Sequence, residues 1–551
     1  ATTTTPRGGV WTTTYDAAGR AVSWKDPLGY AATAAYDAAG RVISKTDKEG
    51  VATTYAYDSV ARAVTATDPL GQISRRVFDA AGRVTTTVDA TGGSTTMEYD
   101  SAGQLSKVTD PLGAVSLLEY DLAGRQVRAT DVAARVSSAA YDALGRVTSR
   151  TLPGGATESV TYDGAGRMLT RTDPMGKVWT STYDSRGNLI ASIDPLGHTS
   201  TAEYDTAGQL VKTTDPTGVV NQFGYDGAGR VAVTWDALGA SWVSSYDADG
   251  HLAGTLDPAG VTHTYTVNLR GERTADKWGT TNSAIYAYTY DKNGQLKTRA
   301  DPSSFTYGYD ARGRVTSVTN ALGQATTTAY ALVNGGSKTT TTRPSGAVSR
   351  AWFDLAGRLT LAADPLGNTG SYTYAADGQL LTVTKPGGGV YRWSYDTAGR
   401  VATATDPLGG VIGYDYDAAG RPTSITYPTG RVISSGYDDA GRMVSSTATA
   451  PGKPIQGFVY GYDDAGRPTT AAASPAAPGV PTLGWSYNSR GQPATVTDAT
   501  GTRELSWDIA GRVSATTSPT GALTTFLYDT GRGQPSGIRG AVNIDLSYRP
   551  D

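Results

Sequence analysis

The sequence Tyr-Asp-Ala-Ala-Gly-Arg at residues 36–41, which follows Asp-Pro-Leu-Gly at residues 26–29, decides how this chain folds. Both stretches are turn signals. The Asp accepts hydrogen bonds from the backbone that follows it, Pro presets φ, and Gly takes the left-handed conformation that closes a type I turn. Together they form the signature of a three-residue hairpin loop with a glycine bulge. We call the first kind Tyr-Asp turns and the second kind Asp-Pro turns.

The residues between the turns predict strands. Examples are 146–151 and 114–120, which are rich in Thr, Val, Ser and Tyr. These segments have the length and the composition of β-strands. Gly, Pro and β-branched residues are frequent, and no apolar stripe has helical spacing, so helices are not expected. Each unit is therefore predicted to be one β-hairpin.

The hairpin unit is repeated along the whole chain. The Tyr-Asp motif recurs every 21 residues from Tyr15 to Tyr246. The register then passes through Val267, slips by two residues at Tyr290 and again at Phe353, and continues to Tyr528. We count 25 copies, and a fixed period of this kind is typical of a repeat architecture. Residues 1–551 are therefore predicted to form a single repeat region.

The composition does not suit a filled core. Leu, Ile, Val and Phe make up about 16% of the 551 residues, below the roughly 20% of ordinary globular chains. The chain is not expected to be disordered either, because it has 48 basic and 51 acidic residues, 33 Tyr and 10 Trp. A sheet of about 50 strands cannot stay flat. We predict an all-β fold in which one continuous antiparallel sheet spirals into a hollow shell.

One face of this sheet is expected to carry an aromatic stripe. The residue two positions before the motif Tyr is often aromatic as well, as in Tyr55/Tyr57 and Trp393/Tyr395. We expect these rings to pack along the wall, although flat aromatic rings also suit sugars. The Arg at the end of the motif, such as Arg146, is expected either to lie over a Tyr ring or to pair with the turn Asp.

Several classes of function are disfavoured by the sequence. The net charge of −3 offers no basic surface for nucleic acid, and no run of 18 apolar residues predicts membrane insertion. Cys is absent, which excludes thiolate chemistry. The stretch Asp247–His251 resembles a calcium loop only faintly, because the other oxygen ligands are missing. We therefore predict no catalytic, cofactor-binding or metal-binding residue and no enzyme.

The three histidines do not predict a site. His198, His251 and His263 are spaced 53 and 12 residues apart and are expected at the surface or in turns. The Asp of each motif is interpreted as a turn cap, because that single role accounts for every copy.

The motif also carries a family resemblance. Tyr-Asp-Ala-Ala-Gly-Arg at 36–41 and 416–421, with Asp-Pro-Leu-Gly between copies, closely resembles the YD repeat of the RHS proteins. That family includes bacterial polymorphic toxins, Tc toxin B and C components and teneurins. The resemblance implies a spiral shell with a toxin enclosed inside it or a cell-surface interaction made outside it. It also implies a self-cleaving Asp-Pro-x-Gly-Leu stretch, but no Asp-Pro-x-Gly here is followed by Leu. Self-cleavage is therefore not expected, and no separate toxin or protease domain is expected within 1–551.

The main functional hypothesis is a non-catalytic shell segment that encloses or presents a C-terminal toxin or effector absent from this chain. The alternative is an extracellular adhesion or carbohydrate-binding scaffold, with a cell-surface glycan or protein as partner. Either role implies a secreted or cell-surface protein. The irregular repeats at about 268–308 and 443–486 are the places where specific function is expected, because insertions in repeat proteins form loops on one face.

Overall fold

The computed structural model describes residues 1–279, 284–301, 304–476, 480–529, 533–541 and 543–546, and within them it shows one sheet of 52 strands and no helix. The strands of the first half are β1 (Thr2–Thr4), β2 (Val10–Tyr15), β3 (Ala21–Lys25), β4 (Ala31–Tyr36), β5 (Val42–Thr46), β6 (Ala52–Asp58), β7 (Ala63–Thr67), β8 (Ile73–Phe78), β9 (Val84–Val88), β10 (Ser94–Tyr99), β11 (Leu105–Thr109), β12 (Val115–Tyr120), β13 (Gln126–Thr130), β14 (Val136–Tyr141), β15 (Val147–Thr151), β16 (Thr157–Tyr162), β17 (Met168–Thr172), β18 (Val178–Tyr183), β19 (Leu189–Ile193), β20 (Thr199–Tyr204), β21 (Leu210–Thr214), β22 (Val220–Tyr225), β23 (Val231–Trp235), β24 (Ser241–Tyr246), β25 (Leu252–Leu256) and β26 (Thr262–Val267).

The strands of the second half are β27 (Arg273–Trp278), β28 (Ala284–Tyr290), β29 (Leu296–Ala300), β30 (Phe305–Tyr309), β31 (Val315–Thr319), β32 (Ala325–Val333), β33 (Gly336–Thr342), β34 (Val348–Phe353), β35 (Leu359–Ala363), β36 (Thr369–Tyr374), β37 (Leu380–Thr384), β38 (Val390–Tyr395), β39 (Val401–Thr405), β40 (Val411–Tyr416), β41 (Pro422–Thr426), β42 (Val432–Tyr437), β43 (Met443–Thr449), β44 (Gln456–Tyr462), β45 (Pro468–Ala473), β46 (Leu483–Tyr487), β47 (Pro493–Asp498), β48 (Gly501–Trp507), β49 (Val513–Thr517), β50 (Leu523–Tyr528), β51 (Pro535–Arg539) and β52 (Ile544–Asp545).

The sheet is a simple meander. Each strand pairs antiparallel with the next strand in the chain, as β11 does with β12 and β12 with β13. Among the described residues, β1 pairs only with β2 and β52 only with β51. The sheet is therefore continuous but not closed, and the predicted all-β fold and continuous antiparallel sheet are confirmed.

Both kinds of turn have the predicted hydrogen bonds. In the Tyr-Asp turn after β14, the amide of Gly145 donates to the carbonyl of Asp142 at 3.0 Å, and the amide of Asp142 donates to the carbonyl of Arg146 at 2.9 Å. The Asp142 carboxylate accepts the amides of Leu144 and Arg146 at 2.9 and 3.0 Å. Gly145 has a φ of 80°, which is the left-handed conformation that the turn requires. The Asp-Pro turn at Asp26 has the same pattern.

The two kinds of turn differ in one respect that the sequence did not predict. After the Tyr-Asp turn the register shifts, because Ala140 faces Ser149 whereas Tyr141 faces Val147. Thr148 is therefore an extra residue, a β-bulge that bends the strand and increases its twist. No such shift interrupts the pairing of β11 with β12, which an Asp-Pro turn connects. The two edges of the ribbon are consequently unlike each other.

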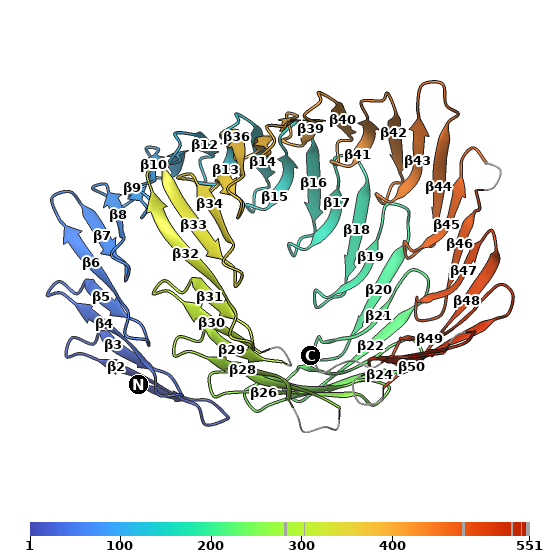
Figure 1. The fold of residues 1–551 in the computed structure, drawn as a ribbon, viewed down its shortest axis with the longest axis horizontal. Helices are drawn as coiled ribbons and strands as arrows, with labels where there is room; N and C mark the ends of the chain where they lie inside the picture. Colours follow the sequence, from blue (N-terminus) through green and yellow to red (C-terminus); the bar gives the residue numbers. More distant parts are fainter. Residues whose placement is uncertain (280–283, 302–303, 477–479, 530–532, 542, 547–551) are drawn as a thin grey trace.

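The ribbon winds around an open centre, as Figure 1 shows. The chain passes once around through β2 to β24 and then begins a second passage, so that β28 to β34 lie beside the early strands and β43 to β48 lie beside β18 to β23. Hydrogen bonds between the two windings join residues 242 to 261 positions apart. The predicted spiral is confirmed, and its winding length is set by these contacts.

The wall is a single layer with almost no buried apolar core. The fully buried apolar residues among those described are small: Ala34, Ala63, Ala240, Val261, Ala363 and Ala471. The apolar tips of the turns are covered only where the windings meet. Leu28, in a covered Asp-Pro turn, is 38% exposed, whereas Leu408, at the same turn position in the second winding, is 97% exposed. Contacts between windings therefore replace part of a conventional core.

The irregular repeats form longer or shorter hairpins. At the degenerate copy near Tyr330, β32 and β33 pair without interruption from Thr327 and Thr342 to Val333 and Gly336, so this hairpin has no bulge. In the copy at 443–462, the pairing of β42 with β43 extends to Thr449. Within 268–308, the run Asp276–Thr281 separates two motifs that are 23 residues apart in the sequence. This run is partly strand, because Asp276 to Trp278 belong to β27. Thr280 and Thr281 lie outside the described residues.

The turn geometry gives the first prediction. Gly166 and Gly164 occupy one Tyr-Asp turn, but only Gly166 has a positive φ, at 87°. A Cβ on Gly164 would meet nothing within 4 Å, and a Cβ on Gly166 would lie in ordinary contact with the Arg146 guanidinium at 3.5 Å. We expect Gly166→Ala to cost about 1–2 kcal/mol because the left-handed conformation is unfavourable for Ala, and we expect the matched change Gly164→Ala to leave the melting temperature unchanged or slightly higher. Equal losses for both variants would contradict the assigned turn.

Candidate functional site

The side chains of the motif join each hairpin to the next. The hydroxyl of Tyr162 donates to the carbonyl of Val147, 15 residues earlier, at 2.8 Å. The guanidinium of Arg146 lies 4.6 Å from the centre of the Tyr162 ring. The same Arg146 pairs with its own turn residue Asp142 at 2.7 Å and donates to the carbonyl of Asp163 in the next turn at 3.2 Å. One Arg therefore takes both of the roles that the sequence left open: it covers a ring and it pairs with the turn Asp.

This arrangement, which we call the Arg clasp, recurs along both windings. Rings covered by the Arg of the preceding motif include those of Tyr36, Tyr57, Tyr99, Tyr141, Tyr162, Tyr183, Tyr246, Tyr330, Tyr374, Tyr416, Tyr437, Tyr462, Tyr487 and Tyr528. Packing of the stripe along the wall is the interpretation that these contacts support. A ring covered in this way does not offer that face to a ligand.

The turn carboxylates are stabilised in their charged form. Hydrogen bonds from the Arg146 backbone, and then from its side chain, hold the pKa of Asp142 below its usual value. For Asp121, the side-chain hydrogen bond from Arg125 is the largest cause of its lowered pKa. These carboxylates are committed to the turns, which agrees with their interpretation as caps.

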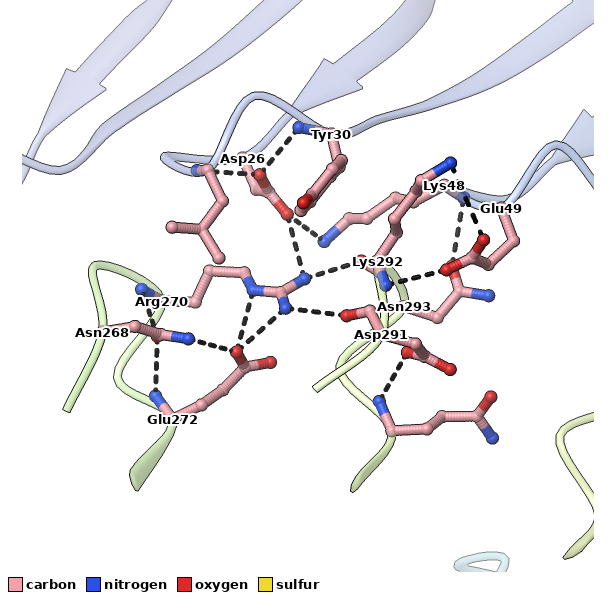
Figure 2. A network of polar contacts seen from close by, with 12 residues as sticks. Asp26, Tyr30, Lys48, Glu49, Asn268, Arg270, Glu272, Asp291, Lys292 and Asn293 are labelled. Carbon is pink, nitrogen blue, oxygen red and sulfur yellow. Dashed lines mark hydrogen bonds and ion pairs between the residues drawn. The ribbon is translucent and has the colours of Figure 1, made fainter. Parts of the chain in front are cut away.

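The two windings meet along a seam, which we define as the contacts between the Asp-Pro turns of the first winding and the Tyr-Asp turns of the second. Figure 2 shows its most buried part. Asp26 is only 2% exposed, and its carboxylate contacts the Lys48 amine at 2.9 Å and the Arg270 guanidinium at 3.2 Å. The Arg270 side chain is 5% exposed and also donates to the carbonyls of Lys292 and Asp291 at 2.6 and 3.0 Å. A buried ion pair with further hydrogen bonds thus fixes one winding on the other.

Polar contacts of the same kind follow the seam around the wall. They are Arg7 with Asp249, Asp47 with Asn293, Glu49 with Lys292, Asp68 with Arg312, Arg135 with Asp377, Lys177 with Asp439, His198 with Asp464, Thr217 with Arg467 and Asp236 with Arg490. Between them the windings approach closely, because a Cβ on Gly154 would lie 3.0 Å from the Cβ of Ala398. The seam is therefore held mainly by charge and small residues.

The seam has a signal in the sequence that the predictions from the motif did not use. The residue before the motif Gly is usually Ala in the first winding, with Arg186 as a charged exception. From Asp249 onward this position is repeatedly polar, as in Asp249, Arg270, Asn293, Arg312, Asp377 and Arg490. Each of these six side chains contacts the first winding. Polar residues at this repeat position therefore mark contacts with the first winding, and Ala still holds the position in other motifs of the second winding, such as Ala356 and Ala419.

The other sequence candidates also lie in turns or at the seam. Asp247 caps its turn and pairs with Arg7 at 3.3 Å, and Asp249 accepts the Thr5 hydroxyl at 3.0 Å, so the oxygens of the calcium-like stretch serve the seam. His198 and His251 contact the Asp of their own turns.

The third histidine, His263, stacks on Trp278 with ring centres 4.5 Å apart. All three histidines are half-buried, and His198 and His251 directly follow turn glycines. Neighbouring turn carboxylates and one indole ring cover them.

Clefts open along the seam. One has a volume of about 940 Å³ and lies between the turn at Asp47–Val51 and the strands that end at Tyr290 and Tyr309. Another, of about 650 Å³, lies between Arg135–Gly155 and Tyr395. A further cleft, of about 820 Å³, lies between Leu152–Glu158 and Thr397–Gly420. Within the part of the chain that the structure describes, no group of His, Asp and Glu residues is arranged to hold a metal ion.

The chain matches the family model described as RHS Repeat. The matched residues are 36–73, 78–115, 99–136, 141–178, 162–199, 183–220, 204–234, 225–262, 290–325, 374–411, 416–453 and 487–523, which together cover more than half of the chain. No curated protein sequence matches it.

Solved structures match the fold along almost the whole chain. The crystal structure of TcdB2-TccC3 without its hypervariable C-terminal region has a TM-score of 0.65 and 15% identity, and the match covers 98% of this chain and 38% of that one. TcdB2-TccC3-Cdc42 has a TM-score of 0.63, 15% identity and the same coverage. The Photorhabdus luminescens Tc holotoxin pore has a TM-score of 0.57 and 14% identity, covering 96% of this chain and 39% of that one. This chain thus spans under two fifths of the chains it matches.

The lowered pKa values of the turn carboxylates predict acid sensitivity. Their folded pKa lies below the unfolded value of about 3.9, so their contribution to stability is complete above that value and is lost as the pH falls through the folded pKa. We expect a constant melting temperature from pH 7 to about pH 5 and a steep decrease below about pH 4. A melting temperature that is unchanged at pH 3 would contradict this role.

The buried ion pair predicts that the seam can be opened locally. Arg270→Ala leaves the buried Asp26 carboxylate with Lys48 and the amides of Leu28 and Tyr30 as its remaining partners, so we expect a loss below the about 3–5 kcal/mol of a buried charge left without a partner. We expect faster hydrogen exchange in the turns at 26–30 and 291–295 and no change far from the seam. The matched control is Arg186→Ala, because Arg186 holds the same turn position but is exposed and contacts only the neighbouring turn. Equal effects of both changes on exchange would show that the seam contact is not stabilising.

Proposed function

Because this chain belongs to the RHS-repeat family, we propose that it is a wall segment of a hollow shell that encloses or presents a C-terminal toxin or effector absent from residues 1–551. The single observation that carries the proposal is the seam, which turns a ribbon of hairpins into a wound wall. A ribbon that only displayed its surface would not need Asp26 and Arg270 buried between its windings. The spiral around an open centre supports enclosure.

The coverage of the comparison structures also supports a partial wall. This chain matches 38% of the chains in the TcdB2-TccC3 structures, so those chains are longer than this one. One of these structures lacks what its name calls a hypervariable C-terminal region, and another carries Cdc42 in its name. We propose by analogy that the effector of the present shell is a separate C-terminal segment.

A structural rather than a catalytic role is proposed for the wall. The RHS-repeat shell is a structural fold, and the acidic candidates Asp142, Asp247 and Asp249 serve turns or the seam. The described residues include no helix long and apolar enough to cross a membrane, and the net charge of −3 offers no basic surface for nucleic acid. We propose a secreted or cell-surface location, which suits a shell that delivers an effector.

The alternative, an adhesion or carbohydrate-binding scaffold with the aromatic stripe as its platform, has less support. The Arg clasp covers one face of most motif tyrosines in both windings, so the stripe as a whole presents few free rings.

Enclosure is tested on the complete gene product, including any segment that follows residue 551. We expect trypsin to leave that segment intact in the assembled protein and to degrade the same segment when it is produced alone. Arg270→Ala, which opens the seam, is expected to increase cleavage of the enclosed segment, whereas Arg186→Ala is not. Rapid cleavage in the unaltered protein would refute enclosure.

A further inference from the structure

The sequence contains two Asn-Gly pairs, Asn293-Gly294 and Asn334-Gly335. The side-chain amide carbon of an Asn lies close to the backbone nitrogen of the next residue, and a following Gly has no side chain that would shield this nitrogen. Attack of the nitrogen on the side-chain carbon is a chemical reason why Asn is thermolabile. Both asparagines are exposed residues of hairpin turns, so solvent reaches both of them. The contacts of each pair therefore decide how readily it reacts.

The first pair is held by the seam. The Asn293 side-chain nitrogen donates to the Asp47 carboxylate at 2.7 Å, and the side-chain oxygen accepts the backbone amide of Lys48 at 3.1 Å (Figure 2). The amide of Gly294 donates to the carbonyl of Asp291 at 3.1 Å, which closes the turn. Hydrogen bonds thus fix both the attacking nitrogen and the side chain that it would attack. They must break before the two groups can reach a reactive geometry.

The second pair lies away from these seam contacts, in the turn that joins β32 to β33. Ala331 holds the position of the motif Asp in this copy, so the turn lacks the carboxylate that accepts backbone amides in regular copies such as that of Asp142. Within the described residues, neither the Asn334 side chain nor the Gly335 amide takes part in a hydrogen bond. No contact therefore has to break before these two groups can meet.

We propose that Asn334 is a site of spontaneous deamidation and that the seam protects Asn293 from the same reaction. The backbone nitrogen of Gly335 loses its proton to solvent and bonds to the side-chain amide carbon of Asn334. The bond from that carbon to the side-chain nitrogen breaks, and ammonia leaves. Water then opens the five-membered imide ring to give an Asp or its isomer with a lengthened backbone. No group is oxidised or reduced, and solvent water is the only other reactant.

The same reaction at Asn293 would alter the seam. Its side-chain nitrogen, which now donates to Asp47, would be replaced by a carboxylate oxygen that faces the Asp47 carboxylate. Two carboxylates that face each other repel, so this contact between the windings could not form again. An opening of the seam that lasts long enough for the reaction is therefore made permanent at this contact. This inference goes beyond the shell function and does not depend on an effector.

The test incubates the 551-residue chain at mildly alkaline pH, where more of the attacking amide is deprotonated, and follows each Asn by peptide mapping with mass spectrometry. We expect Asn334 to deamidate at least tenfold faster than Asn293. Asn334→Gln is expected to abolish the reaction in that turn, because the longer side chain forms the cyclic imide less readily. The proposal is overturned if Asn334 does not react or if the two asparagines react at equal rates.

Protection by the seam is tested with Asp47→Asn. This change keeps the Oδ1 atom that accepts the amides of Glu49 and Val51, so the turn retains its cap. It replaces the carboxylate oxygen that accepts the Asn293 side-chain amide with an NH₂ group, which cannot accept that hydrogen bond. We expect Asn293 to deamidate at least fivefold faster in this variant, with the rate at Asn334 unchanged.

The matched control for this variant is Asp110→Asn. Asp110 holds the same turn position and accepts the amides of Leu112 and Ala114, but among the described residues it has no side-chain contact with the second winding. The control is expected to leave the rate at Asn293 unchanged. Equal effects of the two variants on that rate would refute protection by the seam.

The effect of the reaction on the seam is tested with Asn293→Asp, which carries the product side chain from the start. We expect faster hydrogen exchange in the turns at 47–51 and 291–295 and no change in the same turns for the matched variant Asn334→Asp. Equal exchange in these turns for both variants would show that a carboxylate at residue 293 does not disturb the seam.

Discussion

The carboxylate of the Tyr-Asp turn is the interaction on which the rest of this structure depends. In the copy at Asp142 it accepts two backbone amides of its own turn and pairs with Arg146. The Arg fixed in this way covers the ring of Tyr162 in the next hairpin, and the hydroxyl of that tyrosine bonds back to the first. The same side chains therefore close the turn and pack one repeat against the next. That is why a chain so poor in aliphatic residues can hold a sheet of 52 strands within its described part.

The ribbon has two unlike edges, and this difference makes winding specific. The Tyr-Asp turn at Asp142 is followed by a register shift that is absent from the pairing of β11 with β12 across an Asp-Pro turn, and polar residues before the motif Gly, such as Arg270, contact the first winding. The edge of the first winding that carries the Asp-Pro turns thus meets the edge of the second winding that carries the Tyr-Asp turns. The contact of Asp26 with Arg270 sets the number of residues in one winding. Because the seam depends on charge rather than on apolar area, it closes the wall and still leaves places, such as the cleft at Tyr309, where the wall is open.

Irregular repeats gain a physical meaning in this arrangement. Replacing the clasp Arg by Gln removes the ring contact and the ion pair with the turn Asp, but the Gln amide still bonds to the next turn, as at Gln295. One such replacement lies on the seam beside a shortened hairpin, where Tyr309 lines a cleft. The turn carboxylate Asp291 still accepts the amide of Gln295 there.

The sequence by itself determined the hairpins, their order and the single wound sheet, because each turn is closed by residues within five positions of one another and the aliphatic content is too low for a filled core. It also offered two roles for the motif Arg without showing that one side chain takes both. The seam, the half-burial of His198 and the clefts were decided only by the tertiary structure. They depend on which turn lies above which after about 244 residues, as for Asp26 and Arg270. No single repeat reveals that distance.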